Sequence, residues 1–285
     1  YAEYAEVLEK KGAEILVHPI PDLSFIPVEE AHTLVQKIIQ KSKGGVKTYV
    51  HCFAGIGRSS TLIALYLVSK SLKPSEASEK IIELQPMWPE SPIQRIVVNW
   101  YFRLLRKIRV EKALKLVELG AEYGFHGGLA HASTVAHVAT DLLENTLPDI
   151  REKDYRIAYA AGILHETSKT IDRIFLEKIY SILPNEAEDV KTVLENYRFM
   201  EENAEKLILE SNLDPLKLKL ILVALKLADT IGNAYPGFSY NGISKIDNEL
   251  IISVSLGYIN KMSKVKDSLE KITGLKVKVE EAAFI

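Results

Sequence analysis

His51-Cys52-Phe53-Ala54-Gly55-Ile56-Gly57-Arg58-Ser59-Ser60 lies between an apolar run, 46–51, that predicts a strand and a second run, 59–71, that predicts a helix. A loop that leads into a helix N-terminus points backbone N–H groups inward and favours an anion there. The two glycines let this backbone approach the anion closely, and Arg58 adds a fork that binds two phosphate oxygens. The same field favours the thiolate of Cys52 over the thiol. The stretch therefore predicts a phosphate-binding loop with a cysteine nucleophile.

The Cys-x5-Arg spacing resembles the signature of the cysteine-dependent protein tyrosine and dual-specificity phosphatases, and the resemblance extends over residues 1–108. It implies a phosphocysteine intermediate on Cys52 that water then hydrolyses, without a cofactor. It also implies that the Ser59 hydroxyl helps Cys52 to leave in the second step. The loop residues that would bind the phosphate are Phe53, Ala54, Gly55, Ile56, Gly57 and Arg58. A buried structural cysteine beside a glycine turn is the alternative interpretation.

Two residues outside the loop complete the predicted site. The leaving group needs a proton, and Asp22 lies 30 residues before Cys52 (52 − 22), after a strand and before a helix, where the family places its general acid. An ordinary Pro-Asp turn residue is the alternative for Asp22. Pro92-Ile93-Gln94 resembles the family segment that carries a glutamine near the pocket, so we expect Gln94 to orient the hydrolytic water. A polar residue at a helix start is its alternative.

The first part of the chain is expected to be an α/β phosphatase domain with a parallel-type central sheet. Apolar runs predict strands at 14–17 and 46–51, and helices are expected at 1–11, 28–40 and 59–71. Pro27 and the acids Glu29 and Glu30 suit the start of the second helix, and Lys43-Gly44-Gly45 breaks it. Two strands are few for a sheet, so we expect further strands of this domain to lie before Tyr1.

The second part, 109–285, is expected to be mostly helical, with helices at 110–119, 131–147, 155–169, 174–183, 186–208 and 215–231. A small α+β tail follows, with a hairpin at 244–256 around Asp247-Asn248, a helix at 262–272 and a strand at 275–279.

Histidines and carboxylates on three of these helices predict a cation site. The set is His131, His165, Glu166 and Asp229, with His126 and His137 as spare candidates. Imidazole and carboxylate groups together can bind a divalent ion, and this donor set suits a single Mn²⁺, Fe²⁺, Zn²⁺ or Mg²⁺.

The order of these residues resembles the HD superfamily of metal-dependent phosphohydrolases, and the helical scaffold with its mixed tail resembles the C-terminal part of exopolyphosphatase-type proteins. Glu166 stands where the family pattern has aspartate, and no further histidine follows His165. The resemblance therefore implies a second, metal-dependent phosphohydrolase site, a regulatory module, or a scaffold that has lost its metal and binds a ligand or partner.

Composition excludes several classes of protein. Hydrophobic residues make up 47% and charged residues 26% of the 285 residues, which is typical of globular domains. No apolar run reaches the roughly 18 residues of a membrane span, and no secretory signal is present, so we expect no membrane partner. A single cysteine fits a reducing compartment, and we expect a cytoplasmic protein.

The net charge of −2 divides unevenly along the chain. Residues 1–110 carry 15 Lys+Arg against 11 Asp+Glu, and the remainder carries 21 against 27, giving +4 and −6. This basic excess is too small to predict a nucleic-acid footprint. The sequence favours a phosphatase of phosphotyrosine or phosphoserine/threonine in proteins. The alternatives are a phosphatase of nucleotides, nucleic-acid 5′-phosphates or other small molecules, and a non-catalytic phosphate sensor.

Overall fold

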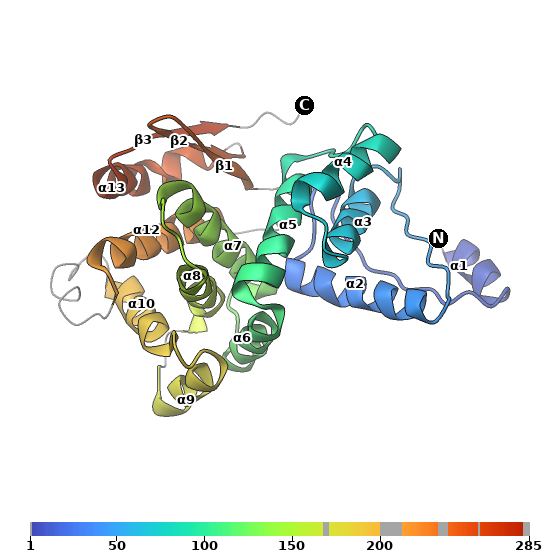
Figure 1. Ribbon diagram of the computed structural model, residues 1–285, viewed down its shortest axis with the longest axis horizontal. Helices are drawn as coiled ribbons and strands as arrows, with labels where there is room; N and C mark the ends of the chain where they lie inside the picture. Colours follow the sequence, from blue (N-terminus) through green and yellow to red (C-terminus); the bar gives the residue numbers. More distant parts are fainter. Residues whose placement is uncertain (1, 168–170, 200–212, 233–238, 256, 282–285) are drawn as a thin grey trace.

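The computed structural model describes residues 2–167, 171–199, 213–232, 239–255 and 257–281. Figure 1 shows the chain running from the N-terminal helices through α5 and α6 into a second group of helices, with a small sheet above them. The N-terminal helices are α1 (Ala2–Glu9), α2 (Val28–Lys43), α3 (Arg58–Ser69), α4 (Pro74–Leu84) and α5 (Pro92–Arg103). A π-helical turn, η1 (Leu104–Ile108), joins α5 to α6 (Val110–Tyr123).

The second group and the tail complete the fold. The helices of the second group are α7 (Gly128–Thr146), α8 (Glu152–Leu164), α9 (Arg173–Ile182), α10 (Ala187–Phe199) and α12 (Pro215–Ile231). The tail consists of β1 (Tyr240–Ile246), β2 (Glu249–Val254), η4 (Ile259–Lys261), α13 (Ser263–Thr273) and β3 (Lys276–Glu281). No helix among these described residues is long and apolar enough to cross a bilayer.

The predicted helices are confirmed with shifted ends. α2 begins after Pro27 with two glutamates in its first turn and ends at Lys43, directly before Gly44 and a little beyond the expected residue 40. α8 ends at Leu164 rather than near 169, which leaves His165 and Glu166 in the turn that follows. The last part of the helix expected at 186–208 lies outside the described residues. α4, with Pro74 at its first position, was not predicted.

The parallel sheet expected in the first part is absent from described residues 2–108. Both runs predicted as strands, 14–17 and 46–51, lack strand pairing, and the sheet that the structure does contain is β1-β2-β3. The apolar side chains of Val17 and Val46 are more than half exposed. A strand forms only beside a hydrogen-bonding neighbour, and these two runs have none among the described residues.

Helix α7 forms the centre of the second part. Every residue from His131 to Leu143 is buried, since α8 and α12 pack along it. α8 approaches so closely at Gly162 that a Cβ there would overlap the backbone of Ala136. Because this contact is backbone against backbone, α7 and α8 form a block with little freedom to slide.

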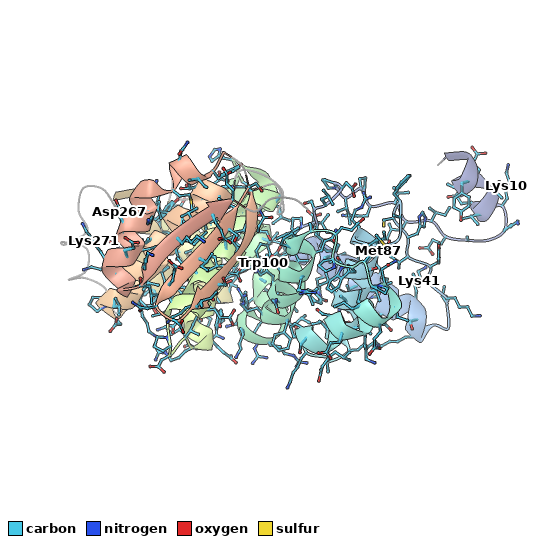
Figure 2. All side chains as sticks on the ribbon, turned by 90° about the horizontal axis from the view of Figure 1, so that it is seen from above. Lys10, Lys41, Met87, Trp100, Asp267 and Lys271 are labelled. Atoms are coloured by element: carbon cyan, nitrogen blue, oxygen red, sulfur yellow. The ribbon has the colours of Figure 1, made fainter. Side chains whose placement is uncertain are left out.

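A buried carboxylate of α7 joins the two groups of helices. Asp141 Oδ2 accepts hydrogen bonds of 2.7 Å from Trp100 Nε1 on α5 and from the Tyr240 hydroxyl on β1. Its other oxygen pairs with Arg103 at the end of α5. In Figure 2, Trp100 lies where the two groups meet. Three donors from α5 and β1 thus satisfy both oxygens of this carboxylate, as buried charges require.

The tail confirms the predicted hairpin, helix and strand. β1 and β2 pair antiparallel up to Ile246 opposite Glu249, and Asp247 takes the left-handed conformation (φ 51°) that a tight turn needs. α13 then crosses back, so that β3 pairs with β2 in parallel. β1 begins at Tyr240, four residues before the predicted start, because its first residues are buried against α5 and α7.

Candidate functional site

The cysteine loop curls around its own thiol. The Gly55 N–H points at Cys52 Sγ from 3.2 Å, and Gly55 has the left-handed φ of +73° that glycine adopts without strain. The Ser60 hydroxyl donates to Gly55 O (3.1 Å) and the Thr61 hydroxyl to Gly57 O (2.8 Å), so the first turn of α3 holds the loop's outer carbonyls. The Gly55 amide thereby faces the thiol, on the side where an anion would bind.

The loop lowers the pKa of Cys52. Partial burial raises the pKa of this thiol. The Ser59 hydroxyl and amide, the Gly55 amide and the Arg58 charge together lower the pKa by more than burial raises it, so the net shift is downward. A thiolate at neutral pH is the nucleophilic form of cysteine, so the electrostatics match the role predicted for Cys52.

Arg58 connects the loop to Asp22. Its Nη1 donates to Ile20 O (3.0 Å) and its Nη2 lies 3.0 Å from Asp22 Oδ1. The Arg58 side chain is largely buried, whereas that of Asp22 is 71% exposed. The structure therefore brings the predicted acid next to the predicted phosphate ligand and leaves the acid open to a substrate.

Gln94 lies directly behind the loop. It is fully buried, its Oε1 accepts from the Glu90 N–H at 2.8 Å, and its Nε2 has no hydrogen-bond partner among the described residues. A Cβ on Gly57 would overlap both the Gln94 amide and the Glu90 carboxylate. An unsatisfied buried amide costs free energy unless something accepts its hydrogen, and a water or phosphate oxygen in the loop would do so.

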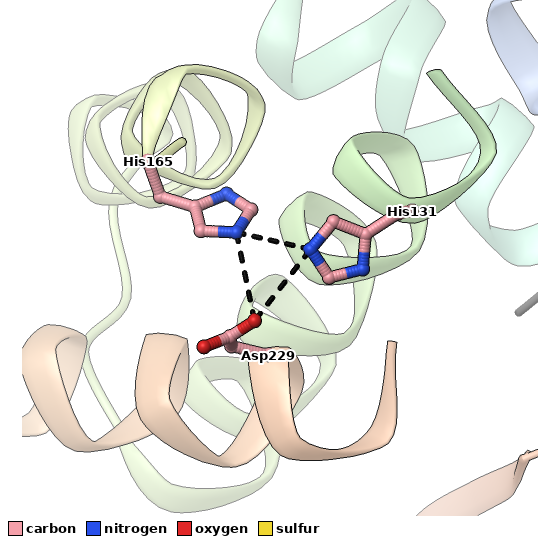
Figure 3. Close-up of side chains that lie close together, drawn as sticks. All are labelled: His131, His165 and Asp229. Atoms are coloured by element: carbon pink, nitrogen blue, oxygen red, sulfur yellow. Dashed lines mark hydrogen bonds and ion pairs between the residues drawn. The ribbon is translucent and has the colours of Figure 1, made fainter. Parts of the chain in front are cut away.

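A second cluster lies in the helical part. His131 on α7, His165 after α8 and Asp229 on α12 place one ligand atom each within 4.8 Å of one another (Figure 3). The two Nε2 atoms are 3.1 Å apart, and Asp229 Oδ1 lies 3.5 Å from His131 Nε2 and 3.7 Å from His165 Nε2.

The outer contacts of these side chains orient them for a cation. His131 Nδ1 faces Gly232 O and His165 Nδ1 faces Gly162 O at 2.7 Å, so each Nδ1 can donate to a backbone carbonyl and each Nε2 points inward. Asp229 Oδ2 accepts from the Tyr197 hydroxyl at 2.7 Å. Burial raises the pKa of Asp229, but His165, Tyr197 and His131 lower it to about 2 overall, so the carboxylate stays ionised. Two imidazoles and a carboxylate suit Zn²⁺, Mn²⁺ or Fe²⁺.

The remaining candidates lie beside this cluster or away from it. Glu166 Oε1 is 3.6 Å from His131 Nε2, while its Oε2 accepts from the Gly127 N–H at 2.8 Å and so caps α7. His126 is exposed, and His137 is buried against Trp100 in a separate network. Neither spare histidine joins the three clustered residues.

Several residues of both sites had no sequence signal. Tyr197 and Gly232 orient the cluster, and Glu90 packs on the cysteine loop, but none belongs to a motif. Their roles follow from tertiary packing alone. Glu29, whose place in the sequence indicates only a helix start, is buried.

Comparison with known proteins bears on the first part of the chain. Residues 3–111 match the family described as "Swiss Army Knife protein, DSP-PTPase phosphatase domain". Over 93 residues, 32% of this chain, it is 40% identical to the phosphatidylglycerophosphate phosphatase PTPMT2 of Arabidopsis thaliana. The aligned segment spans 41% of that relative's length. Both findings support a phosphatase.

Proposed function

We propose that this protein hydrolyses phosphate monoesters through a phosphocysteine intermediate on Cys52. The observation that carries the proposal is that Asp22, from a separate segment, lies against Arg58 of the loop that holds Cys52, a thiol of lowered pKa. This chemistry needs no metal, because the loop itself favours the thiolate form of the nucleophile.

The geometry supports a two-step reaction. The loop amides and Arg58 hold the phosphate, the Cys52 sulfur attacks phosphorus, and the bond from phosphorus to the ester oxygen breaks while Asp22 gives that oxygen its proton. In the second step water attacks phosphorus, its proton passes to the Asp22 carboxylate, and the sulfur leaves with help from the Ser59 hydroxyl. Gln94, with its unsatisfied Nε2, orients that water.

Phosphotyrosine or phosphoserine/threonine in proteins is the first substrate class, from the resemblance of the Cys-x5-Arg loop. A phospholipid headgroup is the second. It is favoured by the relative that acts on phosphatidylglycerophosphate. It is also favoured by two apolar side chains beside the catalytic residues, because Phe53 after Cys52 is 98% exposed and Leu23 after Asp22 is 38% exposed. An amphiphilic substrate could cover both.

A substrate panel tests this proposal. Phosphopeptides, phosphatidylglycerophosphate in mixed micelles, nucleotides and 5′-phosphorylated oligonucleotides would be compared for kcat/KM, with Cys52→Ser as the matched control. We expect Cys52-dependent hydrolysis of at least one class, and the ranking identifies the substrate. Binding of phosphate without Cys52-dependent hydrolysis of any of them would instead establish a phosphate sensor.

For the helical part we propose a single divalent ion held by His131, His165 and Asp229, with Glu166 beside it. The two inward-pointing Nε2 atoms and the Asp229 carboxylate support this site. When bound, such an ion would supply a Lewis acid and an activated water. A second hydrolytic activity that needs the ion and survives Cys52→Ser would make this part catalytic. Ion binding without such activity would make it regulatory.

A further inference from the structure

A second buried carboxylate, Glu29, joins the two groups of helices and takes no part in the chemistry described above. It is the second residue of α2, and its side chain is almost completely buried. Its Oε2 accepts from the Ser133 hydroxyl at 2.7 Å. Its Oε1 accepts from His137 Nε2 at 3.0 Å and from the Tyr159 hydroxyl at 2.7 Å. All three partners belong to α7 and α8, so the described hydrogen bonds of this charge come entirely from the helical part.

The carboxylate is held ionised by these contacts. Burial raises the pKa of Glu29, but the hydrogen bond and charge of His137, with the hydroxyls of Ser133 and Tyr159, lower it overall. An ionised group that is desolvated and fully hydrogen-bonded fixes its position firmly, because any displacement leaves a buried charge unpaired.

Glu29 stands at the end of the acid loop, defined here as residues 19–27. Asp22 lies seven residues upstream (29 − 22), and the segment from Ser24 to Val28 contains Phe25 and Ile26, both at most 2% exposed. Two other hydrogen bonds hold the loop, from Arg58 to Ile20 O and from the Ser91 hydroxyl to Leu23 O (2.6 Å). Residues 24–28, which connect Asp22 and Leu23 to Glu29, are thus anchored in the core and offer a short packed route from Glu29 to Asp22.

The partners of Glu29 share their helices with the histidine pair. His131 precedes Ser133 and His137 on α7, and Tyr159 lies six residues before His165 (165 − 159). Because α7 and α8 are in backbone contact at Gly162, the histidine pair and the three partners of Glu29 lie in one block.

We propose that Glu29 is a positioning residue through which α7 and α8 set the place of Asp22, so that the helical part takes part in the acid step of the phosphatase. This inference rests on the proposed function of Cys52 and Asp22. It predicts that the helical part affects only the steps in which Asp22 moves a proton, and not the binding of phosphate by the loop.

The test uses the full chain with Glu29→Gln, and with Tyr159→Phe as a milder variant that removes one hydrogen bond. Asp141→Asn is the matched control, because it disrupts the other buried carboxylate at the same junction. The partners of Asp141 lie on α5 and β1, and none of them belongs to the acid loop. kcat and KM would be measured for p-nitrophenyl phosphate, phenyl phosphate and an alkyl phosphate.

With Glu29→Gln we expect kcat for the alkyl phosphate to fall about tenfold or more, since loss of general acid catalysis affects poor leaving groups most. The value for p-nitrophenyl phosphate should fall less than about twofold, with KM unchanged. Tyr159→Phe should show the same trend more weakly. Asp141→Asn should lower the melting temperature without changing the ratio of the two kcat values. Equal loss of both activities in Glu29→Gln, or none, would overturn the proposal.

Amide hydrogen exchange of residues 22–26 gives a readout that does not depend on turnover. We expect faster exchange there in Glu29→Gln and not in Asp141→Asn. If the wild-type protein shows no Cys52-dependent hydrolysis, the proposed function fails. In that case amide exchange alone tests whether Glu29 positions the acid loop. Unchanged exchange in folded Glu29→Gln would refute that role of Glu29.

Discussion

The Nε2 atoms of His131 and His165 face each other across 3.1 Å, although the residues lie 34 positions apart in the chain. Each Nδ1 faces a backbone carbonyl, so both Nε2 atoms point to the same place beside the Asp229 carboxylate. Two lone pairs at this distance repel unless a cation or a proton lies between them.

A divalent ion is therefore expected to bind here. After incubation with Zn²⁺ or Mn²⁺ and dialysis, elemental analysis should find about one ion per chain, as expected of one three-ligand site. His165→Ala should lose the ion, while His126→Ala, which changes an exposed imidazole, should keep it. Hydrolysis of p-nitrophenyl phosphate should survive EDTA. An ion content that does not change in His165→Ala would contradict the site.

Replacing Asp22 should separate the acid step from nucleophilic attack. Asp22→Asn is expected to lower kcat for alkyl phosphates by about 10²–10⁴-fold and to have a smaller effect on p-nitrophenyl phosphate, whose leaving group needs little protonation. Cys52→Ser should abolish turnover yet still bind inorganic phosphate, since Arg58 and the loop amides remain. Steady-state kinetics and calorimetry measure these outcomes, and turnover retained in Cys52→Ser would exclude the mechanism.

The thiolate of Cys52 should be visible in its alkylation by iodoacetamide. Because the folded loop lowers the pKa of this thiol, the rate should reach its plateau at a lower pH than that of a free cysteine, whose pKa is about 8.5. Ser59→Ala removes the hydroxyl contact that lowers the pKa of Cys52 most and should move the profile to higher pH. A profile centred at the free value in the wild-type protein would disprove the effect.

The close packing behind the loop predicts that Gly57→Ala is harmful even though its φ of −83° suits any residue. The added methyl overlaps the buried Gln94 amide and the Glu90 carboxylate, and a displacement of about 1 Å in an active site costs on the order of 100-fold in rate. Gly44→Ala is the control, because its Cβ would meet only ordinary contacts of 3.4 Å or more. Similar kcat/KM values for the two variants would show that Gln94 has room to move.

Glu29 also predicts how stability depends on pH. The pKa of Glu29 is lower in the folded chain than in the unfolded chain, where it is about 4.3. The contribution of Glu29 to the free energy of unfolding is therefore complete above about pH 4.3 and is lost as the pH falls through the pKa of the folded state. At pH 7, Glu29→Gln should reduce the free energy of unfolding by about 3 kcal/mol, as for one partner of a buried pair. Urea unfolding between pH 7 and 3 should show this difference shrinking on the acid side. A difference that stays constant with pH would argue against an ionised Glu29.

Short motifs made part of the fold and much of each candidate site predictable. The Cys-x5-Arg loop depends on local backbone geometry, so its spacing alone places Cys52 beside Arg58. Helix ends at Pro27 and Gly44 followed equally from local signals. The long-range contacts carry no such pattern. Nothing local indicates that Glu29, read as an acid at a helix start, lies buried against Tyr159, 130 residues away.

The expected strands show the opposite failure. Runs 14–17 and 46–51 have the apolar composition of strands. Composition describes a single segment, whereas a β-strand forms only by hydrogen bonding to a second segment. β1 and β2 were found because their turn, Asp247-Asn248, brings both partners together within the sequence itself. Glu166, grouped with His131 through the family pattern, places Oε1 3.6 Å from His131 Nε2 and gives its other oxygen to the Gly127 amide.

The two carboxylates at the junction also constrain how this chain can be inherited. Glu29 comes from one side and is satisfied from the other, while Asp141 comes from the other side and is satisfied in part by Trp100 and Arg103. If recombination replaced either half with that of a relative, Glu29 would lose its partners on α7 and α8, and Asp141 would lose Trp100 and Arg103. We therefore expect these residues to have been transmitted together, so that substitutions at Glu29 and Tyr159 coincide among descendants and the two halves have diverged as one lineage.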